Sequence, residues 1–258
     1  MDNFSDMMWI ELRKALRSRM PLFTALGSLF MPLGIGFLIF LAKNPQLASQ
    51  LGLVSAKANL TAFSAADWPS YLKLLSQVIA AGGFFLSVLA ISWVFGREFV
   101  DGTLKDMLAV PVARQAILLA KFSVVALWTA ALIVLIFVLG LGLGALIGLP
   151  QGAPGVVLEG SARAAITGLL VIALVFPFAL MASIGRGYLL PLGIAILIAV
   201  LSNLVVVAGW GDYFPWAVAG LYTQGLPLAP ISFWIVFLTG LAGVFATYLW
   251  WHYADQNR

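Results

Sequence analysis

Six long runs of apolar residues, separated by polar connectors, constrain this chain more than any other feature. Each run is about as long as the ~20 residues that a helix needs to cross a hydrocarbon layer ~30 Å thick. Of the 258 residues, 62% are hydrophobic and only 9% are charged, whereas a soluble domain has about 25% charged residues. Because so few charges cannot cover a surface in water, we expect lipid to surround most of the chain. The sequence therefore predicts an all-α, polytopic membrane protein with a single transmembrane domain.

The apolar runs give the expected boundaries of the spans. These are residues 22–42, 72–95, 122–148, 164–184, 188–208 and 231–251. Asp67, Trp68 and Pro69 are typical of a helix start before the second span, since Asp is a favoured N-cap residue and Pro is tolerated in the first turn. The first run is longer than the apolar region of a signal peptide, and no A-x-A site follows it. We therefore expect it to remain as the first span.

An amphipathic helix is expected before the first span, over residues 7–20. Its apolar residues recur at helical spacing and are Trp9, Leu12, Ala15 and Leu16. Its basic residues lie away from this stripe and are Arg13, Lys14 and Arg17. Such a helix is suited to the lipid interface. The alternative is that these residues form the beginning of the first span, and in either case Pro21 marks a bend.

The distribution of basic residues predicts the orientation of the chain. Ten of the fourteen Lys and Arg residues fall on one side of the predicted topology. They are Arg13, Lys14, Arg17, Arg19, Arg97, Lys105, Arg114, Lys121, Arg186 and Arg258. Cytoplasmic connectors carry an excess of basic residues. We therefore expect both termini and the connector 96–121 in the cytoplasm, and the chain in the cytoplasmic (inner) membrane of a bacterium.

The sequence offers no visible carrier for enzyme chemistry. It has no Cys, and its one His, His252, lies at the expected membrane edge, so we expect no metal site. It has no G-x-x-x-x-G-K-[ST] loop for binding ATP. The predicted spans contain no ionisable residues beyond their edges, whereas ion-coupled transporters generally use such residues as relays. If this protein moves a substrate uphill, we expect the energy to come from a partner.

The connector 96–121 is the place where such a partner would bind. Gly102 allows a turn, Thr103 is a candidate N-cap, and Pro111 ends the short helix that follows. Three apolar residues fall on one face of that helix, namely Leu104, Met107 and Leu108. Lys105 and Asp106 lie on its other faces. Burying each apolar side chain is worth about 1.5–3 kcal/mol. The apolar face is therefore expected either to dock into a partner's groove or to lie on the bilayer surface.

The same connector resembles a motif of type-2 ABC exporter permeases, R-E-x-x-x-G-T-L…P-[VS]-x-R…K. The matching residues are Arg97-Glu98, Gly102-Thr103-Leu104, Pro111-Val112, Arg114 and Lys121. The family includes lantibiotic and bacitracin self-resistance permeases and the permease used in nitrous-oxide reductase maturation. Two features depart from it: Ala113 stands where the family often has Ser, and the connector 43–68 matches no substrate subgroup.

The resemblance implies a transport subunit that works with other chains. A second permease chain, identical or paralogous, would complete the pathway, and a separate ABC-type ATPase would supply ATP and Mg²⁺. The residues implied in coupling to that ATPase are Arg97, Glu98, Gly102, Thr103, Leu104, Lys105, Asp106, Met107, Leu108 and Arg114. Glu98 would lie at the base of the second span. The segment 209–230 would form short re-entrant helices on the outer side.

Small and polar residues within the spans have two interpretations each. Gly140, Gly144 and Gly148 permit close helix packing, or sliding of helices during transport. Six polar residues either hydrogen-bond between helices or contact an amphiphilic substrate such as a peptide, a lipid-linked molecule or a drug: Ser76, Gln77, Ser87, Ser92, Ser202 and Asn203. Two other functions remain open, a self-sufficient channel or secondary transporter, and a membrane anchor that recruits an ATPase without transport.

Overall fold

The protein is described by a computed structural model that covers residues 2–50, 67–104, 107, 111–150 and 155–253. Within these residues the chain is helical and has no strand. Six helical stretches are long and apolar enough to cross a membrane: Met20–Lys43 (α2), Trp68–Val100 (α5, η1 and α6), Arg114–Leu146 (α8), Val156–Ile184 (α9 and α10), Leu189–Val207 (α11) and Pro230–Tyr253 (α13). The prediction of an all-helical protein with six spans is confirmed.

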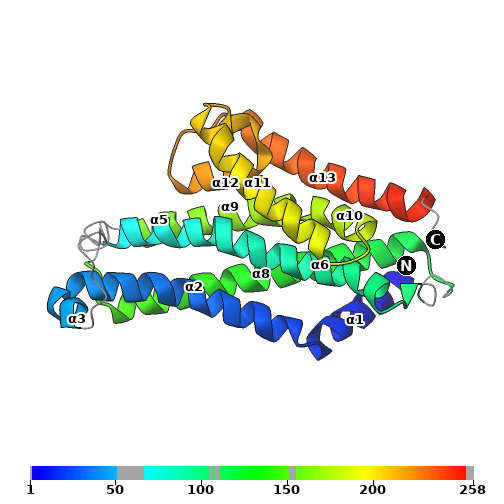
Figure 1. Cartoon of the computed structure of the whole chain (residues 1–258), viewed down its shortest axis with the longest axis horizontal. Helices are drawn as coiled ribbons and strands as arrows, with labels where there is room; N and C mark the ends of the chain where they lie inside the picture. The colour runs from blue at the N-terminus through cyan, green and yellow to red at the C-terminus, as the bar shows by residue number, and fades with distance from the viewer. Residues whose placement is uncertain (1, 51–66, 105–106, 108–110, 151–154, 254–258) are drawn as a thin grey trace.

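Most of the six stretches run along the long axis of the molecule, α11 crosses it obliquely, and both termini lie at the same end (Figure 1). The connection from α6 to α8 and the N-terminal helix α1 (Asp2–Arg17) share this end, which we call the terminal end. The opposite end carries α3 (Pro45–Gln50), the short 3₁₀ helix η2 (Gly211–Tyr213) and the α12 helix (Pro215–Thr223). An even number of spans requires this arrangement, because each span takes the chain to the other end.

Several helices extend beyond their apolar runs. The second stretch begins at Trp68 and ends at Val100, instead of 72–95, while α8 begins at Arg114 and α9 at Val156, each eight residues earlier than expected. Hydropathy finds the part of a helix that lies in hydrocarbon, but the polar turns at its ends are helical as well. The chain bends at residues 18–19, and Pro21 lies in the first turn of α2, so the bend is not at Pro21.

The start of the second stretch has the predicted capping geometry. The Asp67 carboxylate accepts a hydrogen bond from the Ser70 backbone N–H at 2.9 Å, and hydrogen bonding with the side chain and the backbone of Ser70 lowers the pKa of Asp67. Pro69 lies in the first turn, where its missing N–H costs no hydrogen bond. The predicted helix start is confirmed.

Two of the spans are interrupted within their length. The second contains a π-helical segment, η1 (Ile79–Gly83), between α5 (Trp68–Val78) and α6 (Phe84–Val100). The fourth breaks at Phe176, between α9 (Val156–Val175) and α10 (Pro177–Ile184), because Pro177 has no N–H to continue the helix. The backbone of Gly243 in α13 lies against this break, where an added Cβ would be 2.5 Å from the Pro177 nitrogen.

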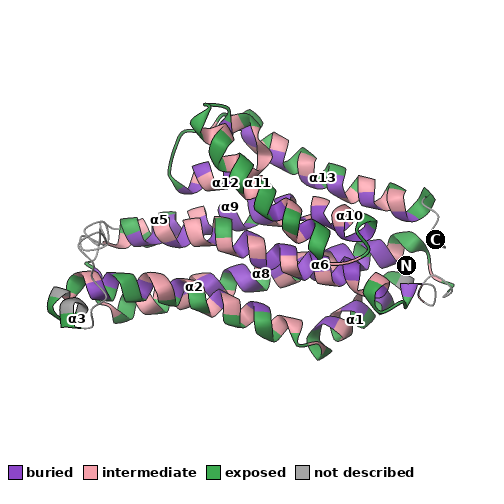
Figure 2. Cartoon of the chain, in the orientation of Figure 1, coloured by how far each residue is buried: buried purple, intermediate pink, exposed green. Residues whose placement is uncertain are grey.

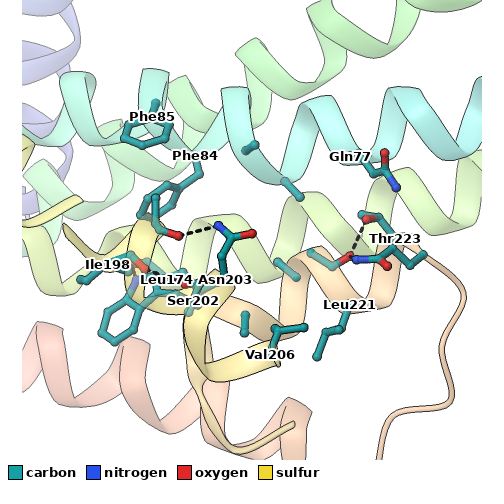
Figure 3. Close-up of a pocket in the computed structure, with 18 residues that line it drawn as sticks. Gln77, Phe84, Phe85, Leu174, Ile198, Ser202, Asn203, Val206, Leu221 and Thr223 are labelled. Atoms are coloured by element: carbon teal, nitrogen blue, oxygen red, sulfur yellow. Dashed lines mark hydrogen bonds between the residues drawn. The ribbon is translucent and has the colours of Figure 1, made fainter. Parts of the chain in front are cut away.

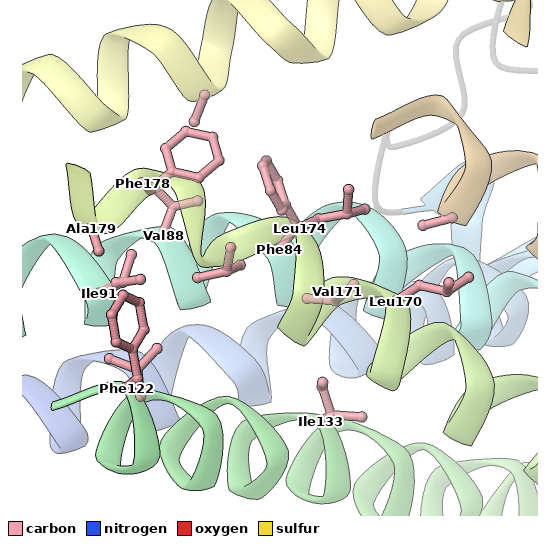
Figure 4. Packing of buried hydrophobic residues seen from close by; sticks show 14 of the residues in the cluster. Phe84, Val88, Ile91, Phe122, Ile133, Leu170, Val171, Leu174, Phe178 and Ala179 are labelled. Carbon is pink, nitrogen blue, oxygen red and sulfur yellow. The ribbon is translucent and has the colours of Figure 1, made fainter. Parts of the chain in front are cut away.

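The core lies where α6, α8, α9 and α10 meet (Figure 4). Phe84, Val88 and Ile91 of α6 pack with Phe122 and Ile133 of α8, and the remaining labelled side chains come from α9 and α10. In contrast, α11 presents mostly exposed or half-buried residues (Figure 2), with only 11% of its apolar window buried. Since its exposed residues are mostly apolar, they are available to lipid or to another chain.

Of the three glycines predicted to allow close helix packing, two lie at such a contact and one does not. An added Cβ at Gly140 would lie 2.5 Å from the Leu75 side chain, and one at Gly144 would lie 2.9 Å from Trp68 and Tyr71. The Tyr71 hydroxyl also donates to the Gly140 carbonyl at 2.7 Å. Gly148 has nothing within 4 Å and a φ of +64°, so it ends α8 in the left-handed region and is not a packing position.

Candidate functional site

The N-terminal helix α1 is attached to the bundle by one face. Met7, Glu11 and Ala15, spaced four residues apart, are buried against α8. On another face Trp9 is 60% and Leu16 67% exposed. Exposed Arg13 and Arg17 and half-buried Lys14 and Leu12 complete the helix. One face therefore contacts protein, while an apolar face and a basic face remain for the lipid interface.

A ring of four alternating charges joins α1 to α6 and α8. The Lys121 ammonium group donates to Glu98 Oε1 at 2.6 Å and to Glu11 Oε2 at 3.0 Å. Lys14 closes the ring, with its Nζ 2.8 Å from Glu11 Oε1 and 3.5 Å from Glu98 Oε1. The Lys121 side chain is completely buried, and both carboxylates are at most 5% exposed. The ring has no net charge when all four groups are ionised.

Lys121 uses its full hydrogen-bonding capacity. An ammonium group has three donors, and the third reaches the Val94 carbonyl of α6 at 2.9 Å. Removing one partner of a buried ion pair costs about 3–5 kcal/mol, because the other charge is left buried and unpaired. The four groups are therefore energetically coupled. One acceptor stays free, since Glu98 Oε2 is buried without a hydrogen-bond partner among the described residues.

Both charges that α1 contributes to the ring are stabilised in their ionised forms. Burial alone would raise the pKa of Glu11, but the ammonium groups of Lys121 and Lys14 outweigh this effect and lower it below 4.5. Burial likewise opposes the charge on Lys14, and the carboxylates of Glu11 and Glu98 outweigh it and raise the Lys14 pKa above 10.5. Glu11 and Lys14 are therefore both charged at neutral pH.

The connection between α6 and α8 packs against the helices that carry this ring. The chain turns at Gly102, whose φ is +69°, and the Met107 amide donates to the Thr103 carbonyl at 3.1 Å, as in a helical turn. Leu104 is only 7% exposed and belongs to the main core. Met107 packs against the buried cluster formed by Met7, Ile117 and Ala120.

The expectation that Leu104 presents an apolar surface to a partner is therefore wrong, because its side chain is buried in this chain. Lys105, Asp106 and Leu108, which were expected on the same short helix, lie outside the described residues. Asp101, Gly102 and Thr103 are exposed.

A groove of about 430 Å³ lies between α1 and this connection. It is lined by apolar residues, including Ile10 and Ile117, and by charged residues, including Glu98 and Asp101. At its edge Arg97 pairs with Asp101 at 2.9 Å and lies 5.0 Å from the Trp93 ring centre. The groove can receive a side chain that combines apolar and polar groups.

Arg114, expected in coupling, instead lies at the end of α13. Its Nη1 donates to the carbonyl of Trp251 at 2.8 Å and contacts that of His252 at 3.4 Å. A cation at a helix C-terminus satisfies carbonyls that have no partner within the helix. The buried Trp251 also donates to Ser183 Oγ at 2.9 Å. Within the described structure Arg114 therefore anchors the C-terminal helix.

A second cavity, of about 380 Å³, lies among α5, η1, the start of α6, α9, α11 and α12 (Figure 3). Apolar groups dominate its lining, which includes Phe84, Phe85 and Trp216. Gln77 and Asn203 add amide groups to it. No ionisable side chain lines the cavity among the described residues. Its chemistry therefore suits an apolar molecule with uncharged hydrogen-bonding groups.

The structure separates the six polar residues that the sequence singled out. Ser76, Ser87 and Ser92 are buried, and each donates to a carbonyl of its own helix four residues earlier. Gln77, Ser202 and Asn203 line the second cavity. Ser202 and Asn203 also donate within α11, at 2.8 Å each. The side-chain amide of Gln77 forms no hydrogen bond with any described residue, which leaves it available in the cavity.

Neither the burial of Lys121 nor the participation of Glu11 in the ring was predicted from the sequence. Lys121 was counted among the polar residues of a connector, whereas it lies in the third turn of α8. Its partner Glu11 is 110 residues away in the chain. A local signal did exist, because Glu11 and Lys14 lie three residues apart on one face of an amphipathic helix.

Comparison with known proteins gives one family and one curated relative. The family model described as "ABC-2 family transporter protein" matches residues 7–202, which include most of α1, the connection from α6 to α8 and most of α11. The chain is 30% identical over 169 residues to the "Bacitracin transport permease protein BCRB" of Bacillus licheniformis, covering 64% of this chain and 81% of the relative. No solved structure matches.

Proposed function

This chain belongs to the ABC-2 family of transporter proteins and is a multi-pass transmembrane subunit of that type, and on this premise we propose that it exports an amphiphilic substrate with energy from a separate ABC-type ATPase. It would act as a permease, without a nucleotide site of its own, while ATP and Mg²⁺ bind to the partner. A second permease chain would complete the pathway.

One observation carries the proposal: the connection from α6 to α8 lies at the terminal end and is built into the bundle. Leu104 enters the main core, and Met107 contacts residues of α1 and α8. A partner that binds the exposed residues Asp101–Thr103 would therefore exert force on α1, α6 and α8 at the same time. This supports transmission of force from an ATPase to the spans.

The excess of basic residues supports a cytoplasmic location for the terminal end. The exposed basic face of α1, with Arg13 and Arg17, belongs to this end. Basic residues are retained on the cytoplasmic side of a membrane and attract anionic lipids there. An ATPase in the cytoplasm could then reach the connection directly.

Co-purification tests the ATPase partner. A tagged chain is purified from native membranes in mild detergent, and the recovered ATPase is quantified. Thr103→Arg places a charge on the exposed connection, and Ala229→Arg places the same charge on an exposed site at the opposite end. We expect Thr103→Arg to lower ATPase recovery about tenfold, equivalent to a loss of ~1.4 kcal/mol in binding, and Ala229→Arg to leave it unchanged. Equal recovery with both variants would contradict the docking site.

The second cavity supports an amphiphilic substrate. Its apolar walls can hold a hydrocarbon segment, while the Gln77 amide offers hydrogen bonds at a depth where unpaired polar groups are costly. Because a relative is named for bacitracin transport, bacitracin is the first compound to test.

A growth assay tests this site. Cells that lack the chain are complemented with the wild type, Gln77→Leu or Ser76→Ala, and the inhibitory concentration of bacitracin is measured. Ser76 is the matched control, since it is adjacent but bonded within its own helix. We expect Gln77→Leu to reduce resistance and Ser76→Ala to preserve it. Resistance that is unchanged with Gln77→Leu would argue against bacitracin contact in this cavity.

The other two functions make different predictions. A self-sufficient channel or secondary transporter would give flux in vesicles that contain the purified chain alone. An anchor would recruit the ATPase, but vesicles of the complex would show no ATP-dependent transport. The family membership and the position of the connection favour the permease.

A further inference from the structure

We infer that Lys121 is a positioning residue that makes α1 part of the force-transmitting unit. Its ammonium group, on α8, donates hydrogen bonds to both α1 and α6 and so fixes the three helices relative to one another. This inference rests on the proposed function, and it adds a role for the N-terminal helix within it. Under the proposal α1 is more than a helix at the lipid interface. It moves together with the connection that receives the ATPase.

The geometry around Lys121 fixes three helices at one point. Its three donors reach Glu11 Oε2 of α1 at 3.0 Å, and Glu98 Oε1 and the Val94 carbonyl of α6 at 2.6 and 2.9 Å. Val94 and Glu98 lie one turn apart, so α6 is held at two points on the same face. Charge-assisted hydrogen bonds are short and directional, and therefore resist relative movement of the helices.

A small apolar cluster links the charge ring to the connection. Met7, Ile117 and Ala120 form a small buried cluster, and Met107 of the connection packs against it. Glu11 follows Met7 by one turn, and Lys121 follows Ile117 by four residues. The apolar cluster and the charge ring are thus successive layers of the same interface between α1 and α8. Movement of the connection would be transmitted to α1 through the apolar cluster and to the spans through the charge ring.

Lys121 also differs from Lys14, its neighbour in the ring. Lys14 contacts the same two carboxylates, but its side chain is 36% exposed. If Lys14 is removed, water can replace part of its hydrogen bonding to the two carboxylates. Water cannot reach the site of the fully buried Lys121 in the same way. A role in positioning is therefore assigned to Lys121 and its partner Glu11, and not to Lys14.

The test uses an environment-sensitive fluorophore on Leu226→Cys, an exposed position at the end opposite the ring. The chain has no native Cys, so the label is unique. The labelled chain is purified with its ATPase and placed in nanodiscs, and the change in emission on adding ATP and Mg²⁺ is measured. Glu11→Ala is the main variant, because it removes the hydrogen bond from Lys121 to α1 and the Glu11–Lys14 pair while leaving Lys121 paired with Glu98. Arg13→Ala is the matched control on the exposed face of the same helix.

We expect Glu11→Ala to reduce the ATP-dependent change at least about fivefold, the lower end of typical coupling between sites, while ATPase recovery stays the same. Arg13→Ala should match the wild type. Lys121→Met should abolish the change, and Lys121→Arg, which keeps the charge, should restore most of it. A full response with Glu11→Ala would overturn the inference and leave the proposed function intact, and so would equal losses with Glu11→Ala and Arg13→Ala. No ATP response in the wild-type complex would refute both.

Discussion

Gly243→Ala tests the contact between α13 and the break in the fourth span. An added Cβ would lie 2.5 Å from the Pro177 nitrogen, 2.6 Å from its Cα and 2.8 Å from its Cγ. These are backbone and ring atoms, which cannot rotate away, so α13 must move outward. Overpacking of this kind costs about 1–3 kcal/mol. Replacing a helical Gly by Ala returns about 0.5–1 kcal/mol. We expect a net loss of about 1.3 kcal/mol in the free energy of unfolding, or roughly ninefold in the equilibrium constant.

The assay is unfolding of the purified chain by sodium dodecyl sulfate in mixed micelles, followed by circular dichroism. Gly142→Ala is the matched control, because an added Cβ there has nothing within 4 Å. This control should be as stable as the wild type or more stable by up to about 1 kcal/mol. Equal stability of the Gly243→Ala and Gly142→Ala variants would show that α13 does not lie against the break as described.

Three further predictions concern individual contacts. Tyr71→Phe removes the buried hydrogen bond to the Gly140 carbonyl and should lower the free energy of unfolding in the same assay by about 1 kcal/mol; no change would contradict that bond. Because the pKa of Glu11 is lowered, its contribution to the stability of the α1 attachment is complete above pH 4.5 and is lost as the pH falls further. The cysteine of a Met7→Cys variant should therefore be protected from maleimide at pH 7. Its exposure by acid, measured with an acid-tolerant thiol reagent, should begin only below pH 4.5. Arg114→Gln should speed amide exchange in the last turn of α13 about fivefold, for a loss of ~1 kcal/mol, and an unchanged rate would argue against its capping role.

The architecture could be predicted because it depends on local composition. Each span is an apolar run of sufficient length, and Asp67 with Pro69 marks a helix start by residue type alone. The break at Pro177 also had a local signal, since a proline inside a predicted span removes a backbone hydrogen bond. The π-helical segment at Ile79–Gly83 had none that distinguishes it from an ordinary helix.

The charge ring could not be predicted in the same way. A lysine in a sequence carries no mark of burial, and Lys121 becomes buried only because Glu11 and Glu98 come from two other helices. Leu104 was wrongly expected on a surface that binds a partner. Helical spacing predicts which face of the helix it occupies, but only tertiary packing decides whether that face contacts a partner or the core of the same chain. Contacts between segments far apart in sequence thus decide the details of the site.

The central claim is that an ATPase docks on the connection between α6 and α8. The most direct test is a photoreactive amino acid at exposed Thr103, activated in native membranes, with identification of the cross-linked protein by mass spectrometry. The account predicts an adduct with an ABC-type ATPase, and none with that protein when the same group is placed at Ala229. Labelling of Thr103 from the external face of intact cells, or an adduct that lacks an ATPase, would contradict it.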